Sequence, residues 1–345
     1  VAGLNEQPEE RYLELVKVLA ANTFYVEITP GVARELHQVV IEFYRRLEKY
    51  MIELLENHNP GILGLSVFSD TLPASLFAFK LTRQKYPHIK TIMGGGVFAD
   101  HLAPGSPNLE IFLEQTHDYI DAVIIGEGET LFRQWLNHEL PPDQRVFTLH
   151  DLVGKILDLS TTLEPDMTGF DLRNYPFVVS YASRSCPFQC SFCSETVQWG
   201  KYRKKEASQV YNELKKLYRR HGSQLFLLSD SLLNPVIDEL AGEFSRSDQA
   251  LYWGGWLRAD GKTGCLENVQ AWRNGGFYHA RMGLESGSQG VLELMGKKIT
   301  IQQIKTAVST LASVGIKTTT LWVVGHPGET EADFQQTLDL ISELR

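Results

Sequence analysis

Short apolar runs followed by small residues constrain the fold of the N-terminal half most strongly. The clearest is ILGLSVF at 62–68, in which apolar and polar residues do not alternate. A strand with this pattern is buried on both faces, as in a parallel sheet. TIMGGGVF at 91–98 and AVIIGEG at 122–128 have the same character. These runs predict three parallel strands.

Helical patterns lie before and between the runs. Residues 34–57 carry an apolar side chain every three or four positions, and Asn-Pro-Gly at 59–61 ends the pattern. Further helices are expected over 72–85 and 129–136. Strands spaced by helices predict an α/β fold with a doubly wound, Rossmann-like N-terminal domain.

Sheets of this kind bind ligands at the carboxyl ends of their strands. Here those ends are Ser66–Asp70, Gly94–Asp100 and Gly126–Glu129. The candidate binding residues are Ser66, Ser69, Asp70, Gly94, Gly95, Gly96, Gly126, Glu127 and Gly128. The glycines could equally serve only to make tight turns, so both interpretations stay open.

Composition excludes several classes of protein. The 42 acidic residues outnumber the 33 basic ones, for a net charge of −9, which gives no electrostatic footprint for binding duplex nucleic acid. No apolar run approaches the ~20 residues that span a bilayer, and the first twenty residues do not form a secretory signal. Four cysteines in so long a chain predict a reducing, cytoplasmic setting instead of a disulfide framework.

From residue 138 to about 175 the sequence is irregular. Proline, aspartate and threonine cluster there without periodicity, which is typical of a linker. We therefore expect an N-terminal domain over 1–137, a linker over 138–175 and a second domain over 176–345.

Three of the four cysteines lie within eight residues. Cys186, Cys190 and Cys193 form a C-x3-C-x2-C motif after a predicted strand at 177–182. A zinc site would need paired C-x2-C units or added histidines, whereas a [4Fe–4S] cube normally takes four thiolates. Three thiolates on one loop would leave one iron open to a substrate or cofactor. Cys265 stands alone and is interpreted as an ordinary half-buried cysteine.

From about residue 163 onward the sequence resembles the radical S-adenosylmethionine (SAM) enzymes, whose most specific signature is this cysteine motif. The block at 279–300 resembles the family's "GxESGS…vL…mxK" pattern, with a fourth strand ending at Glu285. The other strands with matching blocks are LFLLSDSLLN (225–234), YWGGWLRAD (252–260) and TTLWVVGHPGETEADFQQT (319–337). The resemblance implies a (β/α)6 barrel. Only five units precede Arg345, so we expect a partial barrel and a piece of a longer protein.

The resemblance also implies cofactors and the residues that contact them. Cys186, Cys190 and Cys193 would hold the [4Fe–4S] cluster, and an electron donor such as flavodoxin or ferredoxin would reduce it. The implied SAM contacts are Arg258 with the methionine carboxylate, Ser229 and Asp230 with the amino group, Glu285 and Ser286 with the ribose and methionine ends, and Gly325 and Pro327 with adenine. Asp230 and Arg258 could instead form a structural salt bridge. No further catalytic residue is assigned.

The N-terminal runs resemble the cobalamin-binding domain that precedes many radical SAM barrels. The candidate residues at the strand ends would then contact cobalamin. The D-x-H-x-x-G motif that supplies an axial histidine is missing, because His101 follows Asp100 directly. The domain could thus bind cobalamin without a histidine ligand, or be degenerate and only shape the site.

Three functional hypotheses follow. The first is a cobalamin-dependent radical SAM methyltransferase acting on a small molecule or peptide. The second is a radical SAM enzyme that performs a rearrangement, cyclisation or oxidation. The third is a cobalamin- or SAM-binding module without catalysis, which the intact cysteine motif disfavours.

Overall fold

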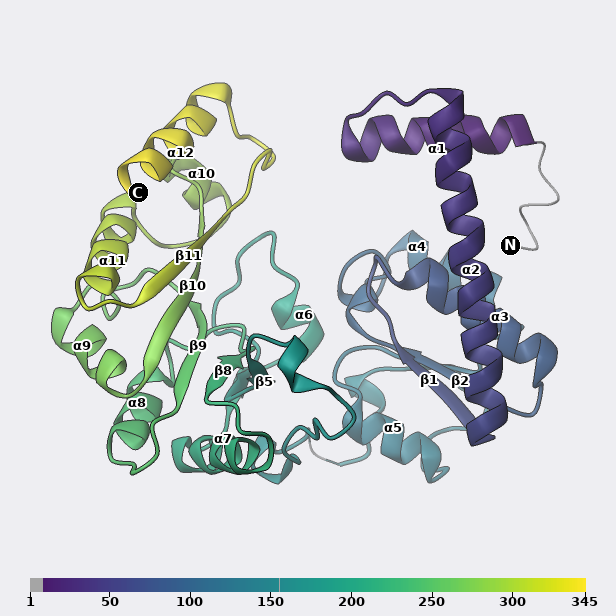
Figure 1. The fold of residues 1–345 in the computed structure, drawn as a ribbon, viewed down its shortest axis with the longest axis horizontal. Helices are drawn as coiled ribbons and strands as arrows, with labels where there is room; N and C mark the ends of the chain where they lie inside the picture. Colours follow the sequence, from purple (N-terminus) through teal and green to yellow (C-terminus); the bar gives the residue numbers. More distant parts are fainter. Residues whose placement is uncertain (1–8, 155) are drawn as a thin grey trace. The chain divides into compact units, whose positions relative to one another are not determined.

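The computed structural model describes residues 9–154 and 156–345 (Figure 1). The chain divides into two compact units, Val1–Asp151 and Leu152–Arg345. Each unit contains a parallel sheet, and each is described by itself. No helix in the described ranges is both long enough and apolar enough to cross a membrane.

The first unit contains a parallel sheet in the order β1-β2-β3-β4. Its strands are β1 (Ile62–Ser66), β2 (Lys90–Gly94), β3 (Ala122–Ile124) and β4 (Val146–Phe147). The connecting elements are α3 (Leu72–Lys85), η2 (Gly96–Ala99), α4 (Pro107–Thr116) and α5 (Glu129–Leu136), and η3 (Leu149–Asp151) follows β4. Phe79, Met93 and Val123 are fully buried in the core between sheet and helices. The expected α/β class is confirmed.

Two details of this sheet differ from the expectation. Its described strands run in chain order, without the reversal of order that marks a switch point in doubly wound sheets. In addition, β4 lies within the stretch expected to be a linker. Arg145 fixes this strand, because its guanidinium donates to the carbonyl oxygens of Leu113 and Ile120 at 2.5 and 2.9 Å. A two-residue strand is too short to leave a periodic signal in the sequence.

In the described part of the chain, two helices precede β1, namely α1 (Glu9–Phe24) and α2 (Pro30–His58). The helix expected over 34–57 is confirmed as α2. It begins where the Thr29 side chain accepts a hydrogen bond from the Val32 amide, and it ends at Asn59 in a left-handed conformation. Its buried residues Met51 and Leu55 pack into the core of the first unit.

The second unit is built on a five-stranded parallel sheet in the order β11-β10-β9-β8-β5. The strands are β5 (Val178–Ser180), β8 (Leu225–Leu228), β9 (Tyr252–Leu257), β10 (Phe277–Glu285) and β11 (Lys317–Trp322). The principal helices are α7 (Ala207–His221), α8 (Ile237–Ser245), α9 (Leu266–Asn274), α10 (Gln289–Leu294), α11 (Ile301–Ser313) and α12 (Glu331–Glu343). All five predicted strands are present, and β10 ends at Glu285 as expected.

Smaller elements complete the unit. The pair β6 (Ser183–Arg184) and β7 (Arg203–Lys204) is antiparallel, and α6 (Glu195–Trp199) lies between them in the chain. Two short 3-10 helices, η4 (Leu159–Thr161) and η5 (Leu172–Asn174), precede the sheet.

The helices bury one face of the second sheet. Val210 of α7, Leu240 of α8 and Ala307 of α11 pack in one core with strand residues such as Trp253 and Met282. Because side chains alternate across a strand, the intervening residues lie on the opposite face. The carboxyl ends of the strands carry the candidate site.

Candidate functional site

The three motif cysteines lie in the loop between β6 and α6. Ser185 begins this loop in a left-handed conformation, with a φ of 71°, and its hydroxyl donates to the carbonyl oxygen of Gly200 at 2.6 Å. The Cys193 amide donates to the carbonyl oxygen of Cys190 at 3.1 Å. The Ser191 amide donates to the carbonyl oxygen of Met295 at 2.9 Å, which ties the loop to the end of α10. The loop is thus fixed along its length.

The chemistry of the three thiols fits an iron–sulfur cluster. Burial raises the pKa of Cys186 and of Cys193, and repulsion from neighbouring thiols of the loop adds to both shifts. Among the described residues, no three histidine, cysteine or acidic side chains gather around one metal ion. A cube takes each thiolate on a different iron, so its ligands need not converge on one point. Thiolates are the soft ligands that Fe–S clusters select.

Arg258 follows β9 and reaches the cysteine loop. Its guanidinium carbon lies 4.0 Å from the centre of the Phe188 ring, and its charge lowers the pKa of Cys186 against the larger effect of burial. The residue is only 5% exposed, yet its Nη2 has no hydrogen-bond partner within the described structure. Its backbone is fixed, because the Arg258 amide donates to Asn234 Oδ1 at 2.8 Å. A buried, unpartnered guanidinium fits a carboxylate.

Ser229 and Asp230 directly follow β8 and form hydrogen bonds to the last residue of β5 and to residues that follow it. The Asp230 carboxylate accepts the Ala182 amide at 3.0 Å and the Ser183 hydroxyl at 2.5 Å. Complete burial raises the pKa of Asp230 to about 6, although these hydrogen bonds oppose the shift. Ser229 donates through its amide and its hydroxyl to the carbonyl oxygen of Ser180. The described residues contain no ion pair between Asp230 and Arg258.

Glu285 forms a buried ion pair with Lys297. Its Oε1 lies 2.7 Å from Lys297 Nζ, and both side chains are about nine-tenths buried. The backbone of Glu285 is left-handed, with a φ of 66°. A side chain at Gly283 would overlap this pair, because its Cβ would lie 2.3 Å from Glu285 Oε1. Lys297 stands in the expected "mxK" pattern, but no pattern in the sequence indicates that Glu285 is its partner.

Ser286 is fully buried and contacts α12. Its hydroxyl lies 3.2 Å from Thr337 Oγ1, and the Gly287 amide donates to the same oxygen at 2.8 Å. A Cβ at Gly287 would lie 2.4 Å from the carbonyl oxygen of Gln336. The residues after β10 therefore pack tightly on α12, a contact that sequence reasoning missed.

Gly325 and Pro327 lie in the exposed turn between β11 and α12. Gly325 has a φ of 80°, and its amide donates to the Glu329 carboxylate. Unlike Arg258, Asp230 and Glu285, which are buried, these two residues are exposed.

The candidate cobalamin residues gather at the carboxyl ends of β1, β2 and β3. Ser66 pairs in register with Gly94. Gly95 has a φ of 111°, and a Cβ there would lie 2.4 Å from both the amide nitrogen and the carbonyl oxygen of Val67. A Cβ at Gly96 would meet the Phe68 ring at 2.7 Å. The glycines thus allow close backbone packing, which agrees with the tight-turn interpretation and leaves the binding interpretation open.

The remaining candidates differ in exposure. The Ser69 hydroxyl donates to Asp100 Oδ2 at 3.1 Å, and Asp70 is exposed. Gly126 has a φ of 89°, Glu127 is buried, and Gly128 precedes α5. His101 lies beside Asp100 with two-thirds of its side chain exposed.

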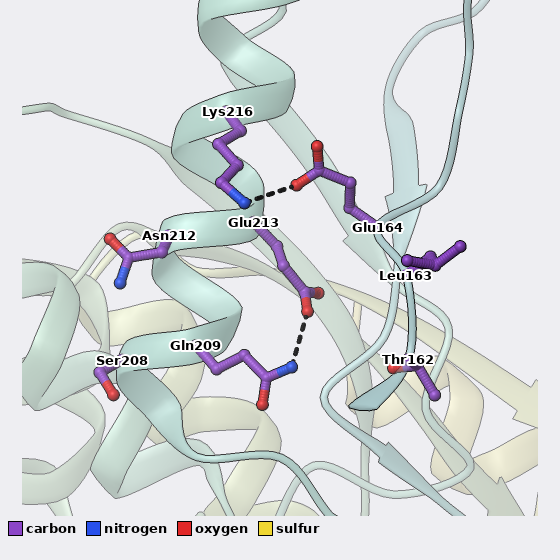
Figure 2. Close-up of a pocket in the computed structure, with 8 residues that line it drawn as sticks. All are labelled: Thr162, Leu163, Glu164, Ser208, Gln209, Asn212, Glu213 and Lys216. Carbon is purple, nitrogen blue, oxygen red and sulfur yellow. Dashed lines mark hydrogen bonds and ion pairs between the residues drawn. The ribbon is translucent and has the colours of Figure 1, made fainter. Parts of the chain in front are cut away.

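A pocket of about 700 Å³ lies beside α7 in the second unit (Figure 2). Figure 2 shows Lys216 directed toward Glu164 and Gln209 hydrogen-bonded to Glu213. The pocket is lined by Thr162, Leu163, Glu164, Ser208, Gln209, Asn212, Glu213 and Lys216. None of the predicted site residues lines it.

Comparison with known proteins identifies relatives that match most of the chain. It is 25% identical over 322 residues to the anaerobic magnesium-protoporphyrin IX monomethyl ester cyclase of Rubrivivax gelatinosus, covering 84% of this chain and 55% of the relative. It is also 25% identical to the uncharacterized methyltransferase PH0819 of Pyrococcus horikoshii, covering 85% of this chain and 66% of that protein. The chain thus spans about half to two-thirds of the length of these relatives.

Among solved structures, the cobalamin-dependent SAM radical enzyme OxsB, with aqua-cobalamin and SAM bound, has the same fold. It superposes with a TM-score of 0.70 at 18% identity, covering 85% of this chain and 45% of OxsB. The model of the radical SAM superfamily matches residues 180–341, which include the cysteine loop and β8–β11. This match identifies a radical SAM domain within the chain, in agreement with the cysteine motif that the matched residues contain.

Proposed function

We propose that this chain is the cofactor-binding part of a cobalamin-dependent radical SAM enzyme that methylates its substrate. One observation carries the SAM part of the proposal. The loop with Cys186, Cys190 and Cys193 lies against a buried cation, Arg258, whose Nη2 has no partner among the described residues. A non-catalytic fold would gain nothing from burying that group unpaired, because burial of an unpaired charge is costly.

Each side chain then has a defined task. The three cysteines hold the cluster, and Arg258 binds the methionine carboxylate of SAM. Ser229 and Asp230 lie near the amino group, Glu285 and Ser286 near the ribose and methionine ends, and Gly325 and Pro327 near adenine. When bound, the reduced cluster and SAM would supply a 5′-deoxyadenosyl radical that removes a hydrogen atom from the substrate. An external donor such as flavodoxin or ferredoxin would supply the electron.

The protein contributes orientation and a desolvated setting. Phe188 holds the Arg258 guanidinium in place, so that its planar fork is pre-organised for a carboxylate. Lys297 holds the Glu285 carboxylate, and Thr337 holds the backbone after it. Asp230 secures Ala182 and Ser183, four and three residues before Cys186, and so supports the start of the cysteine loop.

Cobalamin is assigned to the first unit. The glycine-rich strand ends from Ser66 to Gly128 support this assignment, because sheets of this kind bind ligands at the carboxyl ends of their strands. The cobalamin dependence of the structural relative OxsB supports it as well. We propose binding without an axial histidine, since His101 does not stand in the required motif. The proposal also includes an N-terminal domain over 1–137, a linker over 138–175 and a second domain over 176–345. We further propose a cytoplasmic setting.

A second candidate is an oxidative cyclisation. The relative from Rubrivivax gelatinosus is a cyclase, whereas the one from Pyrococcus horikoshii is described as a methyltransferase. Both candidates need SAM cleavage, and they differ in whether the substrate gains a methyl group.

Anaerobic purification from cells supplied with a corrinoid tests the proposal. Bound iron and sulfide in the ratio of one cube per chain, bound corrinoid, and 5′-deoxyadenosine formed after reduction are expected. A protein with iron and SAM cleavage but no corrinoid, even after reconstitution, would contradict the methyltransferase and favour the second candidate. Absence of 5′-deoxyadenosine would contradict both.

A further inference from the structure

The face of the second sheet opposite its helices carries several cations. In β10, Ala280, Met282 and Leu284 are buried in the core that contains the helices. His279 and Arg281 alternate with them and therefore lie on the opposite face of the sheet. In β11, whose residues alternate in the same way, Lys317 is exposed and Thr318 is half-buried.

The strand register brings these residues together. His279 pairs with Lys317 of β11 and with Gly254 of β9, while Arg281 pairs with Thr319 and Trp256. Paired residues of neighbouring strands lie on the same face. Lys317 therefore lies beside His279, one row before Arg281. His279 Nε2 lies 2.8 Å from Thr319 Oγ1, so the two rows are in contact.

These cations have no acidic counterpart. Among the described residues, neither the Arg281 guanidinium nor the Lys317 ammonium forms a hydrogen bond or ion pair. Arg281 lies over the Phe177 ring, 5.5 Å from its centre. Burial lowers the pKa of His279, and the charges of Arg281 and Lys317 lower it further. The three groups are thus close enough to repel one another.

The charge of this face opposes that of the whole chain, which is −9. Glu285 is the one acidic residue in the five described strands of the sheet, and Lys297 already neutralises it. A surface lined by one sign of charge concentrates ligands of the opposite sign. SAM cannot be that ligand, because it carries more positive than negative charge and its carboxylate is assigned to Arg258.

We propose that His279, Arg281 and Lys317 bind a carboxylate or phosphate group of the substrate. The proposal rests on the proposed function, since the anion is taken to belong to that enzyme's substrate. The guanidinium of Arg281 can bind two oxygens of either group at once, and Lys317 and protonated His279 add donors in the preceding row. Trp256 and Phe177 flank Arg281 and offer apolar surface to the rest of the substrate.

Inorganic phosphate and propionate serve as probes of the full chain. Histidine ring signals are followed by NMR across a pH titration, with His279→Gln identifying the signal of interest. We expect saturable binding of at least one probe and an upward shift of the pKa of His279. The probe that binds more tightly indicates whether phosphate or carboxylate is preferred. No saturable change at His279 with either probe would overturn the proposal.

Substitution separates this site from a general charge effect. Arg281→Met should weaken binding of the preferred probe at least about tenfold, as expected for loss of charged hydrogen bonds. Arg246→Met, which removes a solvent-exposed arginine of the same unit, should leave the affinity unchanged. Equal affinities of all three proteins would overturn the assignment. Lys317→Met, on an exposed edge position, provides a second test if Arg281→Met does not fold.

SAM cleavage distinguishes the failure of this inference from that of the proposed function. Without substrate, Arg281→Met should form 5′-deoxyadenosine at the wild-type rate. Loss of that activity would place Arg281 in the SAM site and overturn the substrate assignment. If wild-type protein bound the probe at His279 but did not cleave SAM, the anion site would stand and the proposed function would fail.

Discussion

The guanidinium carbon of Arg258 lies 4.0 Å from the centre of the Phe188 ring, within the loop that carries the three cysteines. The contact joins the end of β9 to a loop some 70 residues earlier in the chain. It places a buried cation, with Nη2 unpartnered among the described atoms, beside Cys186. The proposed SAM site is built around this relationship.

Arg258→Met should weaken SAM binding without lowering the stability of the folded protein. Since a buried polar group without a partner is costly, its removal should leave the free energy of unfolding unchanged or raise it by about 1 kcal/mol. The Kd for SAM of the cluster-loaded protein should rise at least about tenfold. Urea unfolding and equilibrium dialysis measure the two effects. A strongly destabilised variant with unchanged SAM affinity would mean that Arg258 is structural.

Lys297→Met should destabilise the second unit. It leaves the Glu285 carboxylate buried without its partner, which costs about 3 kcal/mol in comparable cases. The double variant Glu285→Gln with Lys297→Met should recover part of that loss, because no charge remains buried. Urea unfolding of the single and double variants measures both values. Additive losses in the double variant would contradict the account.

Asp230 should make stability depend on pH between about 4 and 6. Burial raises the pKa of this carboxyl to about 6 in the folded protein, above its ordinary 3.8. The folded state therefore holds its proton over a range in which the unfolded state has lost it, and stability falls as pH rises through that window. The loss amounts to about 3 kcal/mol in total.

Comparison with Asp230→Asn isolates this contribution, because the amide does not titrate. The difference in unfolding free energy between wild type and variant should shift against the wild type as pH rises from 4.5, and level off above about pH 7, where the folded carboxyl is ionised as well. A difference that is independent of pH would show that Asp230 has an ordinary pKa.

Gly95→Ala should disrupt the carboxyl ends of β1 and β2. The added Cβ would lie 2.4 Å from the backbone of Val67, at a φ of 111°. Gly105→Ala is a matched control in the same unit, because its φ is also positive, at 78°, but open space surrounds it. The control should lose only about 1 kcal/mol. Gly95→Ala should lose more and should also lose corrinoid binding. Equal effects of the two substitutions would contradict the close approach seen here.

Much of the fold could be predicted because it depends on local patterns. Helices α3 and α5 have the expected bounds, and β10 ends at Glu285 as predicted, because apolar periodicity and a polar strand end mark these elements. In contrast, β4, β6 and β7 have two residues each and leave no periodic signal. Helix α1 was not predicted, since exposed apolar residues such as Leu15 and Leu19 obscure its stripe.

The candidate site was predictable in its residues but not in their partners. The cysteine loop, Arg258 and Glu285 stand in recognisable motifs. The contacts of Glu285 with Lys297 and of Gly287 with Thr337 join positions that only tertiary packing brings together. The same holds for Asp230, whose carboxylate binds Ala182 and Ser183 across the sheet. No pattern within one segment encodes such contacts.

SAM cleavage by cysteine variants tests the central claim most directly. Protein reconstituted with iron and sulfide, then reduced with dithionite in the presence of SAM, is assayed for 5′-deoxyadenosine. We expect Cys190→Ala to form none, whereas Cys265→Ala, which changes the cysteine outside the motif, should form as much as wild type. Wild-type yield from Cys190→Ala, or loss of activity in Cys265→Ala alone, would contradict the assignment of the cluster to Cys186, Cys190 and Cys193.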